Sequence, residues 1–271
     1  MKPRDILLNL GVAAIGLIVL FPLVWMVSVS LMSSGEAVNF PPPLIPSAPT
    51  LEHYRELFVE RGMGRYVFNS FALATLATGL ALLFTVPAGY AFAKLRFAGR
   101  DRLFQLLVAA LVVPAQIGTL PLFLMLKSGG LVNTYAGALV PWLASIFGLF
   151  LVRQYALSIP DEMLEAARVD GATEGQIFRR IVLPTLTPIL VTLALFVFLG
   201  SWNDFLWPLI ILTDQSNYTL PVALASLSRE HVQDIEMMMA GAVITVAPVL
   251  VLFLALQRFY IRGMLAGSVK G

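Results

Sequence analysis

Apolar residues along the chain gather into six long blocks separated by polar segments. A helix needs about 20 mostly apolar residues to cross the hydrocarbon core of a bilayer, and every block reaches that length. The first block is too long for a typical signal-peptide core and no small-x-small cleavage pattern follows it, so we expect a retained helix. The pattern predicts six transmembrane helices, at residues 6–31, 67–93, 103–126, 135–155, 185–212 and 238–259.

Composition supports a membrane protein. Of the 271 residues, 58% are hydrophobic and 13% are charged, and the mean hydropathy is +0.84. A soluble domain carries about a quarter charged residues. We therefore predict an all-α, polytopic membrane protein with a single transmembrane domain over residues 1–271.

Basic residues are divided unevenly between the connecting segments. An even number of spans places both termini on one side, and that side holds 13 of the 18 lysines and arginines. The positive-inside rule then predicts that both termini are cytoplasmic. The 13 are Lys2, Arg4, Lys94, Arg96, Arg100, Arg102, Arg153, Arg168, Arg179, Arg180, Arg258, Arg262 and Lys270. At the membrane surface, Lys94 and Arg96 are expected to extend towards lipid head groups.

Two longer segments are predicted to lie outside the cell, at residues 32–66 and 213–236. The first contains FPPPLIPSAP, whose prolines favour an extended backbone, followed by TLEHYRELF, which predicts a short helix capped by Thr50. Both segments are polar and suit either a docking surface for an external partner or plain solvated loops.

Sequence signatures of catalysis are missing. The chain has no phosphate-binding loop, no HExxH and no GxSxG, and it has no cysteine. Its two histidines, His53 and His231, lie far apart in the sequence, which disfavours a metal site. We expect no catalytic residue, no metal and no cofactor on this chain.

Polar residues interrupt the fifth span at Trp202, Asn203 and Asp204. A carboxylate near the bilayer centre costs about 2.5–3.5 kcal/mol on insertion scales, so it should face a cavity or a partner. One interpretation is a substrate path on which Trp202 offers an aromatic face to a sugar ring. The alternative is an aspartate near the interface, hydrogen-bonded to tryptophan or backbone.

A second polar break lies in the third span, where Gln116 stands between Pro114 and Pro121. The prolines are expected to kink the span and expose carbonyl groups, which membrane proteins tolerate where the backbone lines a cavity. Gln116 is thus a further candidate for the substrate path.

The segment 158–184 is a long polar stretch between two spans. Ser158 and Pro160 favour a helix start, and Gly171 is typical of a helix end. Thr173 and Gln176 form a capping-box pattern that opens a second short helix. One face of the first helix is predicted to hold Met163, Ala166, Ala167 and Asp170. These helices suit insertion into a partner's cleft, or alternatively an amphipathic hairpin on head groups, helped by Arg179 and Arg180.

This segment resembles the signature of permease subunits of bacterial ABC importers, which is EAA, three residues, Gly, nine residues, then I-x-L-P. The match comprises Glu165, Ala166, Ala167, Gly171, Ile181, Leu183 and Pro184. NSFALATLATGLALLFTVPAGYAFAKLRFAGR, WNDFLWPL and the ending QRFYIRGMLAGSVKG also look like the carbohydrate-uptake branch, in particular the smaller permease subunit of maltose-type systems.

The resemblance implies a type I importer (MetI-like) permease fold in the bacterial cytoplasmic membrane. It implies a heterodimer with a second permease, two ATPase subunits that bind ATP and magnesium, and an extracytoplasmic solute-binding protein. Sugar would cross by alternating access, driven through the coupling loop 158–184. The tail from Arg262 to Gly271 would also touch the ATPase.

The same resemblance implies roles for the matching residues. Glu165 would pair with a basic group of the ATPase, beside Asp170 on the same helix. Ala166 and Ala167 would permit close approach, and Gly171 the turn. Ile181, Leu183 and Pro184 would fix the loop to the fifth span.

Three other functions remain open. The transported solute could be glycerol-3-phosphate or a polyol, although no basic group lies in the middle of a span to attract an anion. An ion-coupled secondary transporter would need buried carboxylates, for which Asp204 is the one candidate. A membrane enzyme or receptor is disfavoured by the apolar spans.

Overall fold

The computed structural model describes residues 3–230 and 234–268, and every regular element in these ranges is helical, as predicted. The helices fall into two compact units. The first unit comprises the chain up to residue 67 together with residues 220–251, and the second comprises residues 68–219 and the chain from residue 252.

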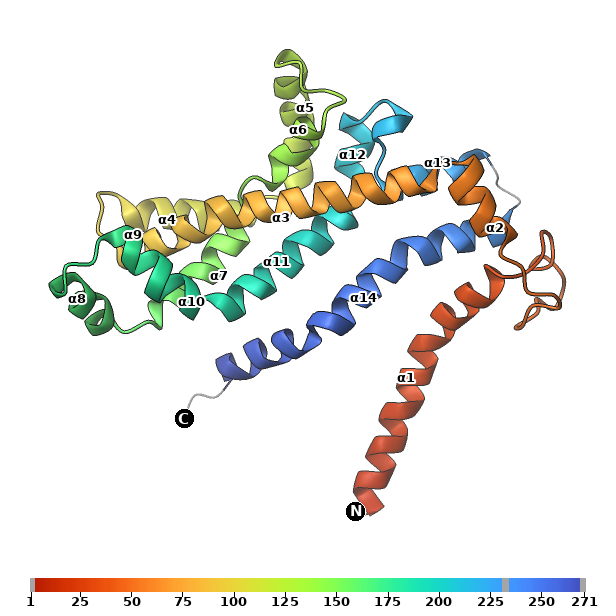
Figure 1. The fold of residues 1–271 in the computed structure, drawn as a ribbon, viewed down its shortest axis with the longest axis horizontal. Coiled ribbons are helices and arrows are strands. Elements are labelled where there is room, and N and C mark those ends of the chain that lie inside the picture. The colour runs from red at the N-terminus through yellow and green to blue at the C-terminus, as the bar shows by residue number, and fades with distance from the viewer. Residues whose placement is uncertain (1–2, 231–233, 269–271) are drawn as a thin grey trace. The chain divides into compact units, whose positions relative to one another are not determined.

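The first unit is built around long apolar helices and a short amphipathic one. Its elements are α1 (Pro3–Val29), α2 (Glu52–Arg55), α13 (Leu220–Glu230) and the first part of α14 (Ile235–Ser268) (Figure 1). A π-helical turn, Glu56–Glu60, continues α2, so the short helix expected in this segment is present. Thr50 helps to begin it, because its Oγ1 accepts a hydrogen bond from the Glu52 N–H at 3.1 Å.

Carboxylates hold the proline-rich segment of the first unit in place. Glu36 accepts a hydrogen bond from the Ser47 N–H at 2.7 Å. Glu236, whose side chain is fully buried, accepts one from the Ala37 N–H at 2.8 Å. These bonds supply acceptors for backbone N–H groups that an irregular segment would otherwise leave unpaired.

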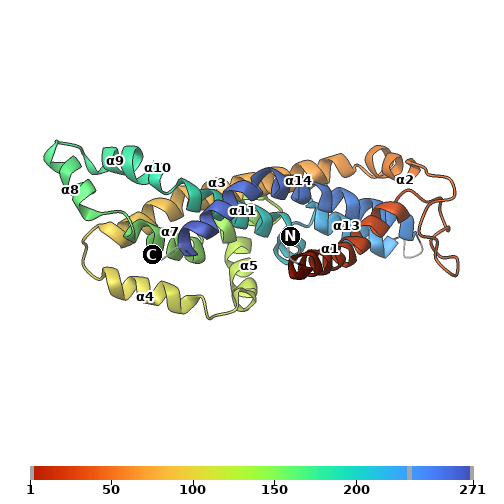
Figure 2. The same ribbon diagram turned by 90° about the horizontal axis from the view of Figure 1, so that it is seen from below.

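The second unit contains the polar segments that the sequence marks as functional. Its helices are α3 (Met63–Lys94, from residue 68), α4 (Arg100–Ala110), α5 (Thr119–Ser128), α6 (Tyr135–Leu139), α7 (Ile146–Leu157), α8 (Asp161–Val169), α9 (Glu174–Ile177), α10 (Leu183–Thr185), α11 (Thr187–Trp202) and α12 (Leu206–Ile211) (Figures 1 and 2). Shorter 3₁₀ turns cover Ala115–Gly118, Val140–Trp142 and Gln215–Asn217, and a π-helical turn covers Phe178–Val182.

Three of the predicted spans are continuous, and three are broken. Leu8–Val29, Met63–Lys94 and Ile235–Ala255 are unbroken helices long and apolar enough to cross a membrane. The third span bends by 95° between Arg100–Ala110 and Ala115–Ser128, and the fourth bends by 43° after Tyr135–Trp142. Counting each bent pair as one crossing brings the number of candidate spans to six. The predicted kink near Pro114 is therefore a full break.

The fifth predicted span is also discontinuous. Glu174–Thr185 meets Thr187–Trp202 at 76°, and α11 then ends at Trp202, before the short α12. The interruption predicted at residues 202–204 is therefore present, whereas the bend at the start of α11 was not predicted. Asn203, Asp204 and Phe205 occupy the interruption between α11 and α12.

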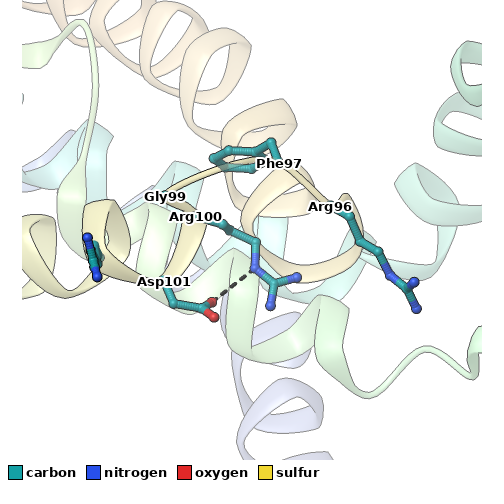
Figure 3. A pocket seen from close by; sticks show the side chains of 6 residues that line it. Arg96, Phe97, Gly99, Arg100 and Asp101 are labelled. Atoms are coloured by element: carbon teal, nitrogen blue, oxygen red, sulfur yellow. Dashed lines mark hydrogen bonds and ion pairs between the residues drawn. The ribbon is translucent and has the colours of Figure 1, made fainter.

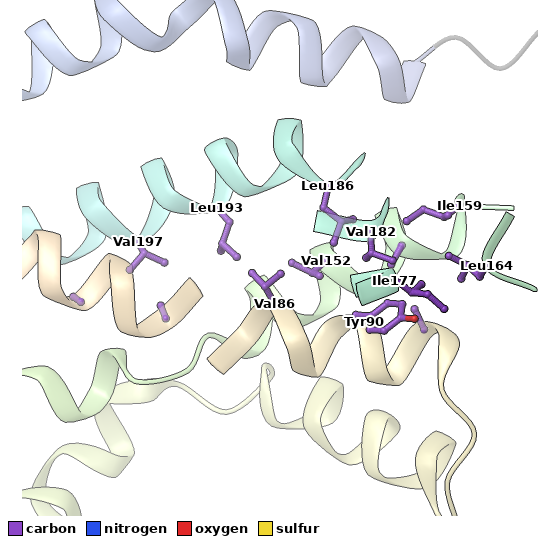
Figure 4. Close-up of a cluster of buried hydrophobic side chains, with 14 residues drawn as sticks. Val86, Tyr90, Val152, Ile159, Leu164, Ile177, Val182, Leu186, Leu193 and Val197 are labelled. Atoms are coloured by element: carbon purple, nitrogen blue, oxygen red, sulfur yellow. The ribbon is translucent and has the colours of Figure 1, made fainter. Parts of the chain in front are cut away.

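Helices of the second unit pack closely through glycine. A Cβ atom on Gly89 of α3 would lie 2.6 Å from the Val152 side chain of α7, and one on Gly148 of α7 would lie 2.6 Å from Leu193 of α11. Larger residues at either position would push these helices apart. Val86, Val152, Leu193 and Val197 lie in the resulting apolar cluster (Figure 4).

At the other end of the second unit, polar side chains join the segments that flank α12. Asn133 Oδ1 accepts hydrogen bonds from the Thr213 N–H at 3.1 Å and the Asp214 N–H at 3.0 Å. Asn69 of α3 donates to the carbonyls of Ser216 and Tyr218, both at 3.0 Å. These contacts fix the position of α12, which carries part of the cavity described below.

Candidate functional site

The predicted coupling loop contains a helix with a sharp end. Gly171 follows α8 with φ of +84°, a conformation that glycine adopts without steric cost. Its N–H donates to the Arg168 carbonyl at 3.0 Å, and the Ala172 N–H donates to the Ala167 carbonyl at 2.9 Å. This pair of bonds is the Schellman motif, and it confirms the predicted helix end.

The start of α8 differs from the expectation in one respect. Ser158 does not cap it, because the Ser158 Oγ donates to the Tyr155 carbonyl at 2.7 Å and so closes α7. Pro160 occupies the N-cap position in an extended conformation and α8 begins at Asp161. Asp161 and Glu162 lie in the first turn, where the helix dipole favours negative charge.

One face of α8 points outward and the other packs on the chain's own core. Glu165, Ala166 and Asp170 are exposed. Leu164 is buried and Ala167 packs against the same core, so Ala167 does not share the outward face predicted for it. Met163 is exposed as predicted, and Glu162 and Val169 are exposed beside it.

Ion pairs and a capping box tie α8 and α9 together. The Thr173 side chain and Gln176 form the predicted capping box at the start of α9. Arg168 Nε of α8 donates to Glu174 Oε1 at 2.7 Å. The Tyr90 hydroxyl of α3 donates to Glu174 Oε2 at 3.2 Å, so this carboxylate links three helices.

Lys94, at the end of α3, also holds the loop. Its Nζ donates to the Ile159 carbonyl and to Asp161 Oδ1, both at 2.6 Å, and its side chain is 6% exposed. The expectation that Lys94 extends to head groups is therefore wrong. The hydrogen bond and charge of Lys94 lower the pKa of the Asp161 carboxyl. Because the folded pKa is depressed, the pair stabilises the fold at neutral pH and is lost as the pH falls through that lowered value.

A π-helical turn connects the loop to α11. Within Phe178–Val182 the Leu183 N–H donates to the Phe178 carbonyl, five residues back. This spacing brings Ile177 and Val182 to the same side, and both are fully buried with Leu186 (Figure 4). Turns of this kind occur often at functional sites.

The three residues predicted to anchor the loop contribute unequally. Ile181 packs against the buried cluster. Leu183 and Pro184 are exposed, so the contacts expected of them are made by Val182 and Leu186. A helical repeat of 3.6 residues does not group these two with Ile177, which is why sequence reasoning missed them. The side chains of the tail from Arg262 to Gly271 lie outside the described residues, so its contact stays a prediction.

A cavity of about 460 Å³ lies among the broken spans of the second unit. Its polar side chains are Gln116, Thr119 and Asp204, and its aromatic ones are Trp142 and Trp207. It thus combines residues from the breaks in the third, fourth and fifth predicted spans. Ala115, Gly118, Leu122, Pro141, Gly200 and Leu206 complete the lining.

Backbone contacts fix the aromatic and acidic groups of this cavity. Trp207 Nε1 donates to the Gly137 carbonyl at 3.2 Å, which orients the indole. Asp204 Oδ1 accepts from the Trp207 N–H at 3.3 Å. Gly200 gives Trp142 room, because a Cβ there would lie 2.8 Å from the ring.

The four predicted path residues separate into two pairs. Gln116 and Asp204 both line the cavity, as expected. Trp202 does not, because it is 1% exposed and stacks on Phe198 with ring centroids 6.0 Å apart. Asn203 donates to the Leu199 carbonyl at 2.8 Å, at the end of α11. Trp142 and Trp207 are the aromatic residues that line the cavity instead, and Trp142 is the more exposed of the two. The only sequence signal for them is a tryptophan beside a proline.

The cavity holds one carboxylate and no basic side chain. Across the part of the chain that the structure describes, no group of three or more His, Asp or Glu side chains is placed to hold a metal ion. The partly exposed Trp142 ring and a few polar groups suit a neutral polyhydroxyl ligand, whose C–H faces stack on aromatic rings, while Trp207 is 7% exposed and forms part of the wall.

Comparison with known proteins gives a consistent result. Residues 85–265 match the family model of the binding-protein-dependent transport system inner membrane component. The arabinooligosaccharides transport system permease protein AraQ of Halalkalibacterium halodurans is 39% identical, over 98% of this chain and 96% of its own. The lactose transport system permease protein LacG of Rhizobium radiobacter is 31% identical, over 93% and 91%.

A solved structure shares the fold. A chain of a bacterial ABC transporter involved in the import of the acidic polysaccharide alginate superposes with a TM-score of 0.83 at 24% identity. The similarity covers 95% of this chain and 96% of that one. At this level of identity the match speaks for the fold alone.

Proposed function

Because the chain belongs to the family of binding-protein-dependent transport system inner membrane components, we propose that it is a permease subunit of an ATP-driven importer of sugars or oligosaccharides. It forms half of a translocation pathway with a second, different permease in the bacterial inner membrane. ATP is hydrolysed on two separate ATPase subunits, and an extracytoplasmic binding protein delivers the solute.

The outward face of α8 carries this proposal. Glu165, Ala166 and Asp170 are exposed, while the opposite side of the helix is attached to the chain's own core through Leu164. A narrow, partly acidic helix fits a groove with basic groups on an ATPase. The residue types match the family signature. In that family the corresponding helix docks on the ATPase.

Movement of the docked helix would reach the spans through one exposed ion pair and a set of buried apolar contacts. Arg168 and Glu174 join α8 to α9, and Val182 and Leu186 connect the π turn to the core. The 76° bend at the start of α11 changes the direction of the chain at that point. We propose that closure of the ATPases shifts this assembly as one body and switches the pathway between inward-open and outward-open states.

The cavity is the proposed substrate path. Trp142 would stack on a sugar ring, with Trp207 in the wall behind the path, while Gln116 and Asp204 would hydrogen-bond to hydroxyl groups. The relatives named for arabinooligosaccharides and lactose support a neutral oligosaccharide. Because the lining holds a carboxylate and no basic group, an anionic solute such as glycerol-3-phosphate is disfavoured; a polyol remains compatible.

Substitution of Glu165 tests the coupling surface. Glu165→Lys reverses the charge on the outward face without altering a buried contact, so we expect the ATPase to be lost from the purified complex and uptake to fall to background. Glu60→Lys, at an exposed glutamate predicted to be extracellular, is the matched control. Normal co-purification and normal uptake in Glu165→Lys would refute the assignment.

The energy source separates this proposal from a secondary transporter. We expect uptake of labelled arabinooligosaccharides or lactose to continue when a protonophore collapses the proton gradient, and to stop when cellular ATP is depleted. An ion-coupled transporter that used Asp204 would show the reverse pattern.

A further inference from the structure

The turn between α3 and α4 forms a second cavity, of about 480 Å³, away from the proposed substrate path (Figure 3). Its lining is Arg96, Phe97, Gly99, Arg100, Asp101 and Arg102. We call residues 96–102 the arginine turn. Three arginines and one aspartate leave it with a net charge of +2 within seven residues.

Aromatic and polar contacts hold the arginine turn in one conformation. The Phe97 ring lies edge-on to Phe92, with centroids 5.5 Å apart. Arg100 Nη1 donates to the Leu95 carbonyl at 3.3 Å, and its Nε pairs with Asp101 at 3.0 Å. Asp101, the one acidic group in the turn, is thereby already engaged.

The other two arginines are available to a ligand. Arg96 and Arg102 are exposed and make no hydrogen bond or ion pair with the rest of the described chain. Arg96 also acts electrostatically on Asp161, but that carboxylate is held by Lys94 at 2.6 Å. Two free guanidinium groups beside one cavity are suited to a phosphate group, which they bind through paired N–H donors.

Exposed leucines continue the site along α4. Leu103 and Leu106 are 48% and 68% exposed, and Leu106 lies one helical turn after Arg102, on the same side of the helix. α4 is the first half of a predicted span, so in the predicted orientation these side chains would lie where acyl chains begin. A free phosphate would use the arginines and leave the leucines uncovered.

We propose that the arginine turn binds the phosphodiester headgroup of an anionic phospholipid, with an acyl chain along Leu103 and Leu106. The anionic lipid surface attracts basic side chains next to a membrane span, and cavities between spans bind such headgroups. The proposal rests on the membrane location and the cytoplasmic placement of this turn, and does not depend on which solute is transported.

Native mass spectrometry of the full-length chain in detergent tests the site, with phosphatidylglycerol and phosphatidylcholine of identical acyl chains as probes. We expect preferential binding of phosphatidylglycerol. Each arginine near an anionic lipid contributes about fivefold in affinity, so Arg96→Gln/Arg102→Gln should weaken binding about 30-fold. Arg96→Lys/Arg102→Lys should retain most of it.

Arg55→Gln/Arg65→Gln removes the same charge from exposed arginines elsewhere and should bind like the unchanged chain. Size-exclusion elution of each variant reports folding. Equal binding of the two lipids, or unchanged binding in Arg96→Gln/Arg102→Gln, would overturn the proposal. So would full displacement by millimolar inorganic phosphate, which indicates a small-anion site. Loss of co-purifying subunits with unchanged lipid binding would assign the turn to a protein partner instead.

Discussion

Trp142 lines the same cavity as Asp204 although the two residues are far apart in the sequence. Trp202 stands next to Asp204 in the sequence, yet it is buried against Phe198, whereas Trp142 lies 62 positions from Asp204 and lines the same cavity. The prediction from neighbouring positions in the sequence was therefore wrong for the aromatic residue, Trp202, and right for the acidic residue, Asp204.

Gly200→Ala tests the role of the Trp142 ring. The added Cβ would lie 2.8 Å from that ring and force it to shift; overpacking of this kind costs about 1–3 kcal/mol. We expect reduced solute uptake with normal amounts of protein in the membrane. Gly79→Ala, where nothing lies within 4 Å of the new Cβ, is the control. Equal uptake in both variants would argue against a cavity shaped by Trp142.

At the scale of elements, the π turn decides how the coupling loop joins the fifth span. The π turn contains one residue more than a turn of α-helix. As a result the Val182 side chain lies in the core, whereas the Leu183 side chain does not. The signature residues Leu183 and Pro184 remain on the outside. Their neighbours Val182 and Leu186 make the buried contacts, and the proposed mechanical connection therefore runs through them.

Leu186→Ala tests that connection. Leu186 is fully buried, and truncation of a buried leucine costs about 2–5 kcal/mol. We expect a lower thermal unfolding midpoint, and ATPase activity of the complex that no longer responds to solute. Leu183→Ala removes the same atoms from a side chain that is 36% exposed and should cost about 1–2 kcal/mol, less than Leu186→Ala. If Leu183→Ala were the more damaging change, the assignment of the connection to Leu186 would be wrong.

At the scale of the whole molecule, orientation in the membrane follows from charge. The predicted cytoplasmic segments hold 13 of 18 basic residues, and the arginine turn is one of them. The two compact units each gather residues from distant parts of the sequence. The orientation itself is a property of the chain in the bilayer and stays a prediction.

Because the chain has no cysteine, single cysteines report its orientation directly. Ala48→Cys lies in the predicted external segment and Ala98→Cys in the arginine turn, and both positions are exposed. In intact spheroplasts a membrane-impermeant maleimide should label Ala48→Cys alone, and both variants should react after lysis. Labelling of Ala98→Cys before lysis would reverse the topology.

The sequence by itself determined the helical class, the approximate positions of the apolar segments and the two short helices of the polar segment 158–184. Those features depend on local properties: runs of apolar residues, capping residues, and the short motif from Glu165 to Pro184. It also identified Gln116 and Asp204, because a polar group in an apolar span needs a partner or a cavity.

The tertiary structure alone decided which side chains meet. The chain changes direction at the 95° and 76° bends, at the π turn and at the breaks between helices. The 3.6-residue helical repeat does not predict these changes of direction. They turn Trp202 inward, bring Trp142 and Trp207 to the cavity, and give Val182 and Leu186 the anchoring contacts. Lys94 was predicted to extend towards lipid head groups, but its Nζ donates to Asp161. The sequence could not show this bond, because the two residues are 67 positions apart in the sequence and close only in the fold.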